Sequence, residues 1–206
     1  MTNEDLPSAP LQAWMTAVLA CVVGQQSAVY VSTPITTGER FVTWKRGLAA
    51  AVRTGDDEYS KGLLEHVVTP NRAQVAGLVE RLRSTSDSPV IDPTALEDVP
   101  GWQQLDYHGF WTEVIRRYAH TVVFAEGWHY SSGCVLELAT AAEAGVALLR
   151  QDPEPLTSAK ARDLVRLAIT DISTDDVLSQ EPLQQALRVL ETRQEQGATK
   201  PRGAFK

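Results

Sequence analysis

The stretch that decides the fold is TVVFAEGWHYSSGCVLELATAAEAGVALL, residues 121–149. It begins with an apolar, β-branched run, passes through a loop of small and aromatic residues, and follows a helical pattern to a second apolar run at 145–149. Two short apolar runs on either side of a helix are typical of parallel strands joined by a right-handed crossover. The stretch therefore predicts a parallel sheet with helices packed on its faces.

Two more strands are predicted upstream, in SAVYVS at 27–32 and PVIDP at 89–93. Helical patterns precede or follow them at 11–26, 40–53, 71–84 and 106–120, and the polar segment TGDDEYSKG at 54–62 is predicted to be a surface loop. The first of these helices carries Leu11, Trp14, Met15, Val18 and Val22 at helical spacing. We take this stripe as the apolar face of an amphipathic helix.

After residue 151 the patterns are helical only, and Leu183, Leu187 and Leu190 form a second apolar stripe. This stripe predicts either helices that cover the domain or a subunit interface. The expected organisation is an N-terminal tail and helix over 1–26, an α/β domain over 27–150, and a C-terminal helical extension over 151–206. We expect the basic end, ATKPRGAFK, to be disordered.

Composition narrows the function. The chain has 206 residues, 43% hydrophobic and 22% charged, as in an ordinary globular protein with one core. A net charge of -7 disfavours a nucleic-acid polymer as partner, although one small phosphate needs only a few N–H groups or one arginine. Because Cys21 and Cys134 stand outside any metal-ligand spacing, we expect no metal and no cofactor.

Two segments that were compared with membrane spans and signal peptides indicate no membrane association. The longest apolar run, AVLACVV at 17–23, is far shorter than the roughly 20 residues that a membrane span needs. The segment MTNEDLPSAP is acidic and lacks the basic start of a signal peptide. A cytoplasmic location is therefore expected.

Candidate ligand-binding residues follow three of the strands. In an open parallel sheet, ligands lie beyond the carboxyl ends of the strands, where loops meet the amino ends of helices. The candidates after the first strand are Ser32, Thr33, Pro34, Gly38 and Arg40; Asp92 follows the second; Trp128, Ser131, Gly133 and Glu137 follow the third.

The third loop is the richest of the three. Ser131 and Gly133 are small, and the N–H groups that open the following helix are free to hold an anion. Glu137, four residues past Gly133, is expected in the first helical turn, where the helix dipole keeps it ionised. Its carboxylate either stabilises the helix or acts on a ligand, as nucleophile or as a counter-charge to a cationic sugar carbon.

Two other candidates have equally ordinary interpretations. Trp128 is suited to stacking a nucleobase or to packing within its loop. Asp92 either hydrogen-bonds a ribose hydroxyl, orients the glutamate, or belongs to a simple turn, since Asp-Pro is a common turn signal. Tyr30 lies in a strand expected to be buried.

The order of several segments resembles a known group of enzymes. VYVSTPITTGERF, NRAQVAGLVERLRS leading to VIDP, FWTEVIRRYAHTVVFAEGW and the S-x-G-x-x-x-E pattern in SSGCVLE are similar to the nucleoside 2-deoxyribosyltransferase-like superfamily, including its nucleotide N-hydrolase branch. The likeness covers residues 28–149. It implies an α/β, flavodoxin-like three-layer sandwich with a parallel sheet, flanked here by N- and C-terminal helices.

The resemblance also implies an activity, namely cleavage or transfer at the N-glycosidic bond of a nucleotide or nucleoside. In that superfamily the glutamate matching Glu137 attacks the anomeric carbon, and the region of Tyr30 lines the sugar pocket. Ser131 replaces an aspartate of the transferases and matches the hydrolases, which bind a 5'-phosphate. Gly38 and Arg40 are similar to nucleotide-contacting residues, and relatives often form homo-oligomers, which we expect here.

The sequence departs from this pattern at two positions. Thr33 stands where the superfamily has a glycine directly after the first strand, and His120 where an aspartate commonly opens the third strand. The alternative expectation is therefore a non-catalytic nucleotide-binding or sensor module on the same fold.

Overall fold

The structure is a computed structural model and describes residues 8–25, 27–48, 52–152, 154–174 and 178–199. Its sheet has strands β1 (Ala28–Ser32), β2 (Val90–Ile91), β3 (Ala119–Phe124) and β4 (Ala147–Arg150), in the order β2-β1-β3-β4. All three neighbouring pairs are parallel. The strands expected from the sequence are therefore confirmed, as is the α/β class.

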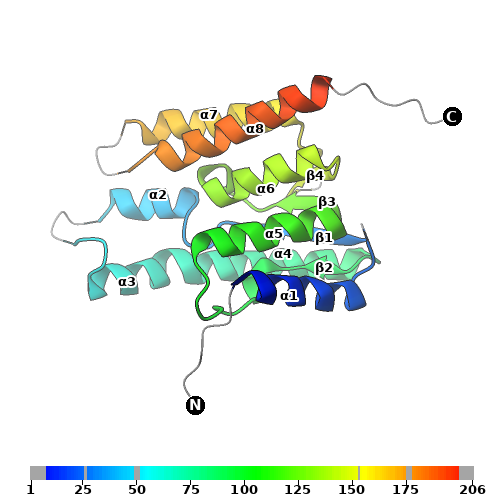
Figure 1. Ribbon diagram of the computed structural model, residues 1–206. Coiled ribbons are helices and arrows are strands. Elements are labelled where there is room, and N and C mark those ends of the chain that lie inside the picture. The colour runs from blue at the N-terminus through cyan, green and yellow to red at the C-terminus, as the bar shows by residue number, and fades with distance from the viewer. Residues whose placement is uncertain (1–7, 26, 49–51, 153, 175–177, 200–206) are drawn as a thin grey trace, which may run out of the picture.

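The described helices surround this sheet. They are α1 (Ser8–Val22), α2 (Glu39–Arg46), α3 (Asp57–Leu63), α4 (Thr69–Thr85), α5 (Gln104–Tyr118), α6 (Ser132–Glu143), α7 (Ser158–Ile172) and α8 (Glu181–Thr199). Helices α1, α5 and α6 lie in front of the sheet in Figure 1, and α4 lies behind it. This arrangement is consistent with a flavodoxin-like three-layer sandwich.

Strand alternation divides the core into two parts. Val29 and Val31 face α4 and pack with Val75 and Leu78. Because side chains alternate along a strand, Tyr30 faces the opposite layer, where it belongs to the same cluster as Leu138 of α6. The next residue on that face, Ser32, is fully buried. The side of the sheet that carries Tyr30 and Ser32 is thus the side covered by α5 and α6.

The C-terminal helices cover the domain. Leu183, Leu187 and Leu190 are at most 9% exposed and belong to the cluster that contains Leu138 of α6. Helix α8 lies along α6, with α7 beside it (Figure 1). Of the two interpretations of this stripe, the cover is the one observed. The end of the predicted basic tail, from residue 200, lies outside the described residues.

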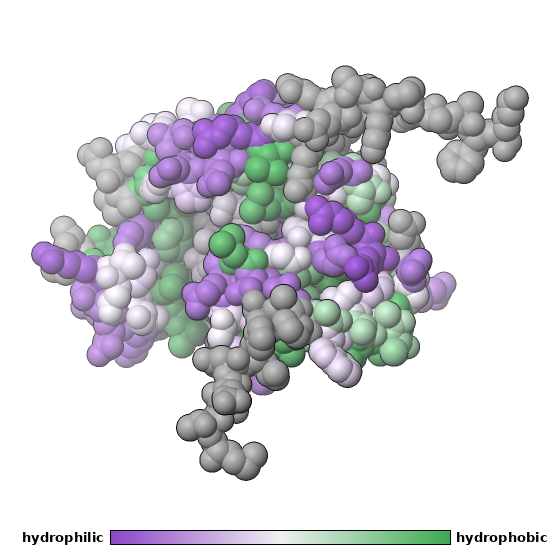
Figure 2. All heavy atoms as spheres, in the orientation of Figure 1, coloured by the Kyte–Doolittle hydropathy of each residue, from purple (hydrophilic) through white to green (hydrophobic). Residues whose placement is uncertain are grey.

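The predicted apolar face of α1 is wrong in part. Trp14, Val18 and Val22 are 73%, 60% and 75% exposed, whereas Leu11 and Met15 pack against the core. The buried side is set by contact with α5, where Tyr118 donates a hydrogen bond to the carbonyl oxygen of Thr16. The part of the surface over α1 accordingly shows apolar patches in Figure 2.

The predicted loop at 54–62 is also wrong, because α3 begins at Asp57 and continues through a π-helical turn, Leu64–Val68, into α4. Tyr59 holds α3 in place by packing edge-on against Trp44, with Lys45 4.6 Å from the centre of its ring. Helix α2, conversely, ends at Arg46, short of the predicted 53. Among the described residues, no helix has both the length and the apolar character needed to cross a membrane.

Candidate functional site

The candidate site lies at the carboxyl ends of β1 and β3. The chain leaves β1 toward β2 on one side of the sheet, whereas β3 and β4 extend it on the other. This reversal is the topological switch point, where ligands bind in open α/β sheets. Ser32 is the last residue of β1, and α6 begins a few residues after β3. The side chain of Ser32 and those of the first turns of α6 therefore lie close together here.

Glu137 of α6 is the centre of the site. Its Oε1 accepts a 2.8 Å hydrogen bond from the Tyr30 hydroxyl, and its Oε2 accepts a 2.6 Å bond from the Ser32 hydroxyl. Both donors come from alternate positions of β1, which point to the same face of the sheet. The carboxylate is therefore held by two donors, while the Glu137 residue as a whole stays partly exposed.

Burial shifts the ionisation of this carboxyl group. It raises the pKa of Glu137 to about 7, although the Ser32 and Tyr30 hydroxyls favour the ionised form. The expectation of a fully charged first-turn carboxylate is thus wrong: α6 begins at Ser132, which puts Glu137 in its second turn, beyond the main reach of the helix dipole. Near neutral pH the group is about half protonated.

Ser131 has the capping role that its position suggested. Its Oγ accepts a hydrogen bond of 3.5 Å from the Cys134 N–H at the start of α6. It also accepts a 2.9 Å hydrogen bond from Thr37 of the loop after β1. Thr37 is one of the polar residues that follow the first strand in the sequence. Its hydroxyl now ties the first loop to the helix that carries Glu137.

Cys134 is buried beside Ser131 at the start of α6, near Glu137. Desolvation and the nearby Glu137 charge raise the pKa of its thiol to about 12. The thiol is therefore protonated and serves as a polar packing group, not as a nucleophile.

Gly133 lies against His108 of α5. A Cβ atom at this position would be 3.2 Å from Nε2 of His108 and 3.8 Å from Oγ of Ser131. His108 comes from α5 and is partly buried, and its Nε2 also lies 3.0 Å from Nε2 of Gln104. The contact between α5 and α6 depends on how the two helices pack in space, which leaves no pattern in the sequence. The position of His108 beside Gly133 therefore could not have been predicted.

Asp92 was interpreted either as a site residue or as part of a turn, and the structure shows the turn. Its Oδ1 accepts hydrogen bonds from the backbone N–H and the hydroxyl of Thr94, at 2.9 Å and 2.7 Å, and caps a 3-10 turn at Pro93–Ala95. No described hydrogen bond joins it to Glu137. Its charge still raises the pKa of Tyr30, so the carboxylate lies near the site.

Arg40 is directed away from Glu137. Its Nε and Nη2 donate to Asn71 and Gln74 of α4, each over 3.1 Å. These residues line a cleft of about 430 Å³ that also includes Trp44 and Gly127. The structure therefore places Arg40 in a cleft between α2, α4 and the loops after β1 and β3, whose lining does not include Glu137.

The remaining predicted residues shape the loops. Trp128 is 4% exposed and packs against Phe124 with ring centres 5.0 Å apart, so its ring offers no free face for a base. Gly38 has φ 92° and lies close to Pro34, where a Cβ atom would approach the proline Cβ to 2.6 Å. Thr33 follows β1, and its hydroxyl donates to the neighbouring Pro34 carbonyl over 3.4 Å.

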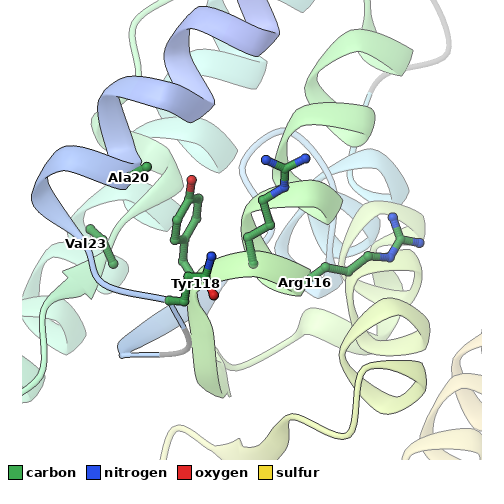
Figure 3. A pocket seen from close by; sticks show the side chains of 6 residues that line it. Ala20, Val23, Arg116 and Tyr118 are labelled. Carbon is green, nitrogen blue, oxygen red and sulfur yellow. The ribbon is translucent and has the colours of Figure 1, made fainter.

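The largest of four hollows in the described part of the chain lies far from this site. It has a volume of about 730 Å³ and lies at the amino ends of the strands, where Ala20, Val23, Arg116 and Tyr118 line it (Figure 3). None of the four main hollows of the described surface has Glu137 among its lining residues.

The described residues contain no group of three or more His, Cys, Asp or Glu side chains placed to hold a metal ion. No family model, curated protein or solved structure matches the chain. The case for a function therefore rests on the geometry of the Glu137 cluster.

Proposed function

We propose that the protein cleaves the N-glycosidic bond of a nucleotide or nucleoside, with Glu137 as nucleophile. The observation that carries this proposal is the position of Glu137: a carboxylate held by Tyr30 and Ser32 at the switch point of a parallel sheet. Two hydrogen bonds fix its oxygens against the edge of the sheet. Orientation of this kind is what attack on a sugar carbon requires.

The reaction has two steps. One Glu137 oxygen forms a bond to the anomeric carbon as the bond to the base nitrogen breaks, and the base leaves with the electron pair and takes up a proton from solvent. Water, or a second base, then attacks the same carbon, loses a proton to solvent and releases the carboxylate. Because positive charge builds on the sugar in each transition state, a nearby negative charge lowers both barriers.

Movement of the first loop would widen access for a substrate. The Thr37–Ser131 hydrogen bond joins that loop to the start of α6, and the main hollows do not reach Glu137. Opening would break this hydroxyl–hydroxyl bond and the hydrogen bonds that Asn71 donates to the carbonyl oxygens of Ile35 and Thr37, each of which costs about 1 kcal/mol. Movement of this size is compatible with turnover.

The test is a chromatographic screen for free base after incubation with ribo- and deoxyribonucleotides and their nucleosides. Glu137→Gln keeps the size of the side chain but removes the nucleophile, so release is expected to disappear. Glu80→Gln is the matched control, because Glu80 is exposed on α4, at the opposite face of the sheet. Equal release by the wild type and Glu137→Gln would reject the nucleophile.

A non-catalytic nucleotide-binding module is the second candidate. It is favoured by the two hydrogen bonds that already occupy the Glu137 oxygens and by the raised pKa, which keeps about half of the carboxyl groups protonated near neutral pH. Such a module would be stabilised by nucleotides through mass action, without release of base. The same screen, combined with thermal melting, separates the two functions.

A further inference from the structure

Helix α5 contributes two side chains to the Glu137 cluster that the proposed function does not use. Gly133 and Glu137 are four residues apart and thus lie on one face of α6. His108 lies directly over that face, since its Nε2 is 3.2 Å from where a Gly133 Cβ would be. The imidazole therefore lies against the face of α6 that also carries Glu137, one helical turn away.

Trp111 is the second of these side chains. It follows His108 by three residues and so lies on the same side of α5. Its ring centre is 6.0 Å from that of Tyr30, whose hydroxyl holds Glu137. Trp111 and His108 are both partly exposed, unlike the buried Trp102 and Phe110 of the neighbouring core. We call the Trp111 and His108 side chains the α5 wall.

The chemistry of the α5 wall suits a flat, uncharged group. The indole packs against Tyr30 and Phe110, with ring centres 6.0 Å and 4.7 Å away, and its exposed part is an aromatic surface of the kind on which any nucleobase can stack. Burial lowers the pKa of His108, so the imidazole is neutral near pH 7, with one nitrogen as donor and the other as acceptor. Gln104 is its hydrogen-bonding neighbour, at 3.0 Å.

A phosphate would find no cation on this wall. The arginines of α5, Arg116 and Arg117, lie at its last turn, near the amino end of β3, and are engaged with Glu113. Arg40 lies in the cleft between α2 and α4. The α5 wall is therefore better matched to the base of a nucleotide than to its phosphate.

We propose that the α5 wall is the nucleobase subsite of the Glu137 site, with Trp111 stacking on the base and His108 hydrogen-bonding its edge. The proposal rests on the proposed function for its substrate class. His108 then determines which bases are accepted, because a base without a matching edge makes no hydrogen bond with the imidazole.

The experiment measures binding and base release on the same full-length proteins. The probes are free adenine, guanine, cytosine and uracil, their nucleoside 5'-monophosphates, and ribose 5-phosphate as a probe without a base. Calorimetry gives the Kd values. Trp111→Leu and His108→Leu are expected to weaken nucleotide and base binding roughly tenfold or more, with ribose 5-phosphate unaffected.

Conservative variants guard against loss of folding. Trp111→Phe keeps an aromatic face and should bind within a few-fold of the wild type. His120→Gln is the matched histidine control, because His120 is exposed at the amino end of β3 and pairs with Thr121 and Ser88. Circular dichroism checks that each variant is folded.

Each outcome decides the proposal. It is overturned if neither base nor nucleotide binds, if both Leu variants bind them as the wild type does, or if ribose 5-phosphate loses as much affinity as the nucleotides. Binding that depends on the α5 wall, without any release of base, would reject the proposed activity and keep the subsite. Release that is unchanged in both Leu variants would reject the subsite and keep the activity.

Discussion

The Tyr30 hydroxyl donates a 2.8 Å hydrogen bond to Oε1 of Glu137, although 107 residues separate the two in the chain. Tyr30 is fully buried, and its own pKa is raised well above the usual value by that burial and by the Glu137 charge. The phenol therefore stays protonated and acts only as a donor. It stabilises the ionised carboxylate that a nucleophile requires.

Tyr30→Phe is expected to make Glu137 a weaker acid. The variant keeps the packed ring but removes one of the two donors, so the pKa of Glu137 should rise above about 7, by roughly one unit. The pH midpoint for base release should move upward by the same amount. Tyr59→Phe is the matched control, since Tyr59 is buried on α3, away from the site. An unchanged midpoint in Tyr30→Phe would contradict the role of this hydrogen bond.

Glu137→Gln is expected to stabilise the protein at high pH. The pKa of Glu137 is raised from 4.5 to about 7 on folding, so the folded state binds the proton more tightly than the unfolded state. Its contribution to stability is therefore lost as the pH rises from about 4.5 to about 7. Urea unfolding should show the variant more stable by about 1–3 kcal/mol at pH 8 and equal to the wild type at pH 4.

Asp171→Asn provides a control of opposite sign. Arg46 lowers the pKa of Asp171 through a 3.2 Å ion pair and a hydrogen bond, so this carboxylate stabilises the fold above its unfolded pKa and loses that effect as the pH falls. The variant should therefore lose stability at neutral pH and regain parity in acid. If Glu137→Gln behaved in the same way, burial would not be the cause of the Glu137 shift.

The strands and the main helices could be predicted because they depend on local apolar patterns. The segment 121–149, for example, contains two short apolar runs on either side of a helical pattern, an order typical of parallel strands. Helix α3 was missed because its segment is polar, and Tyr59 becomes buried only through Trp44 of another helix. The outward face of α1 was misjudged for the same reason, since α5 decides which side is covered.

The candidate site was predicted only as far as strand ends allow. Glu137, Tyr30 and Ser32 meet because β1 and β3 are neighbours and α6 covers the face that carries alternate residues of β1. Arg40 follows the same strand but is drawn toward Asn71 and Gln74, which no pattern in the loop indicates. A sequence shows which residues follow a strand, but not to which side of the loop each one turns.

Ser131→Ala is expected to impair the site beyond its effect on the helix. Loss of an N-cap costs about 1 kcal/mol, and Thr157→Ala is a matched control because Thr157 caps α7 by accepting from the Lys160 N–H over 3.2 Å. Only Ser131 also binds Thr37. Both variants should lose similar stability in urea, whereas only Ser131→Ala should change nucleotide affinity. Equal affinities would show that the tie to the first loop has no part in binding.

Gly133→Ala is expected to change base selectivity with little change in stability. The added Cβ gains roughly 0.5–1 kcal/mol in helix formation, but it would lie 3.2 Å from His108 Nε2 and displace the imidazole. Gly77→Ala in α4 is the matched control, because its Cβ would meet only Arg81, at 3.8 Å. That control should raise the unfolding free energy and leave selectivity unchanged. An altered selectivity in both variants would point to a general effect on the fold.

Asn71→Ala is expected to loosen the first loop from a distance. Asn71 is 6% exposed; its amide donates to the carbonyl oxygens of Ile35 and Thr37, at 3.0 Å and 3.5 Å, and accepts from Arg40. Removing it leaves these groups unpaired, which should cost about 2 kcal/mol, or roughly 4–8 °C in melting temperature.

Gln74→Ala is the matched control for Asn71→Ala. Gln74 also accepts from Arg40, but it lies on the exposed side of that contact and makes no hydrogen bond to the loop among those described. Its loss should cost only a few tenths of a kcal/mol, as surface substitutions usually do. Because Thr37 reaches Ser131, only Asn71→Ala should also weaken nucleotide binding. Equal costs in urea unfolding would show that Arg40, and not the loop, is what Asn71 stabilises.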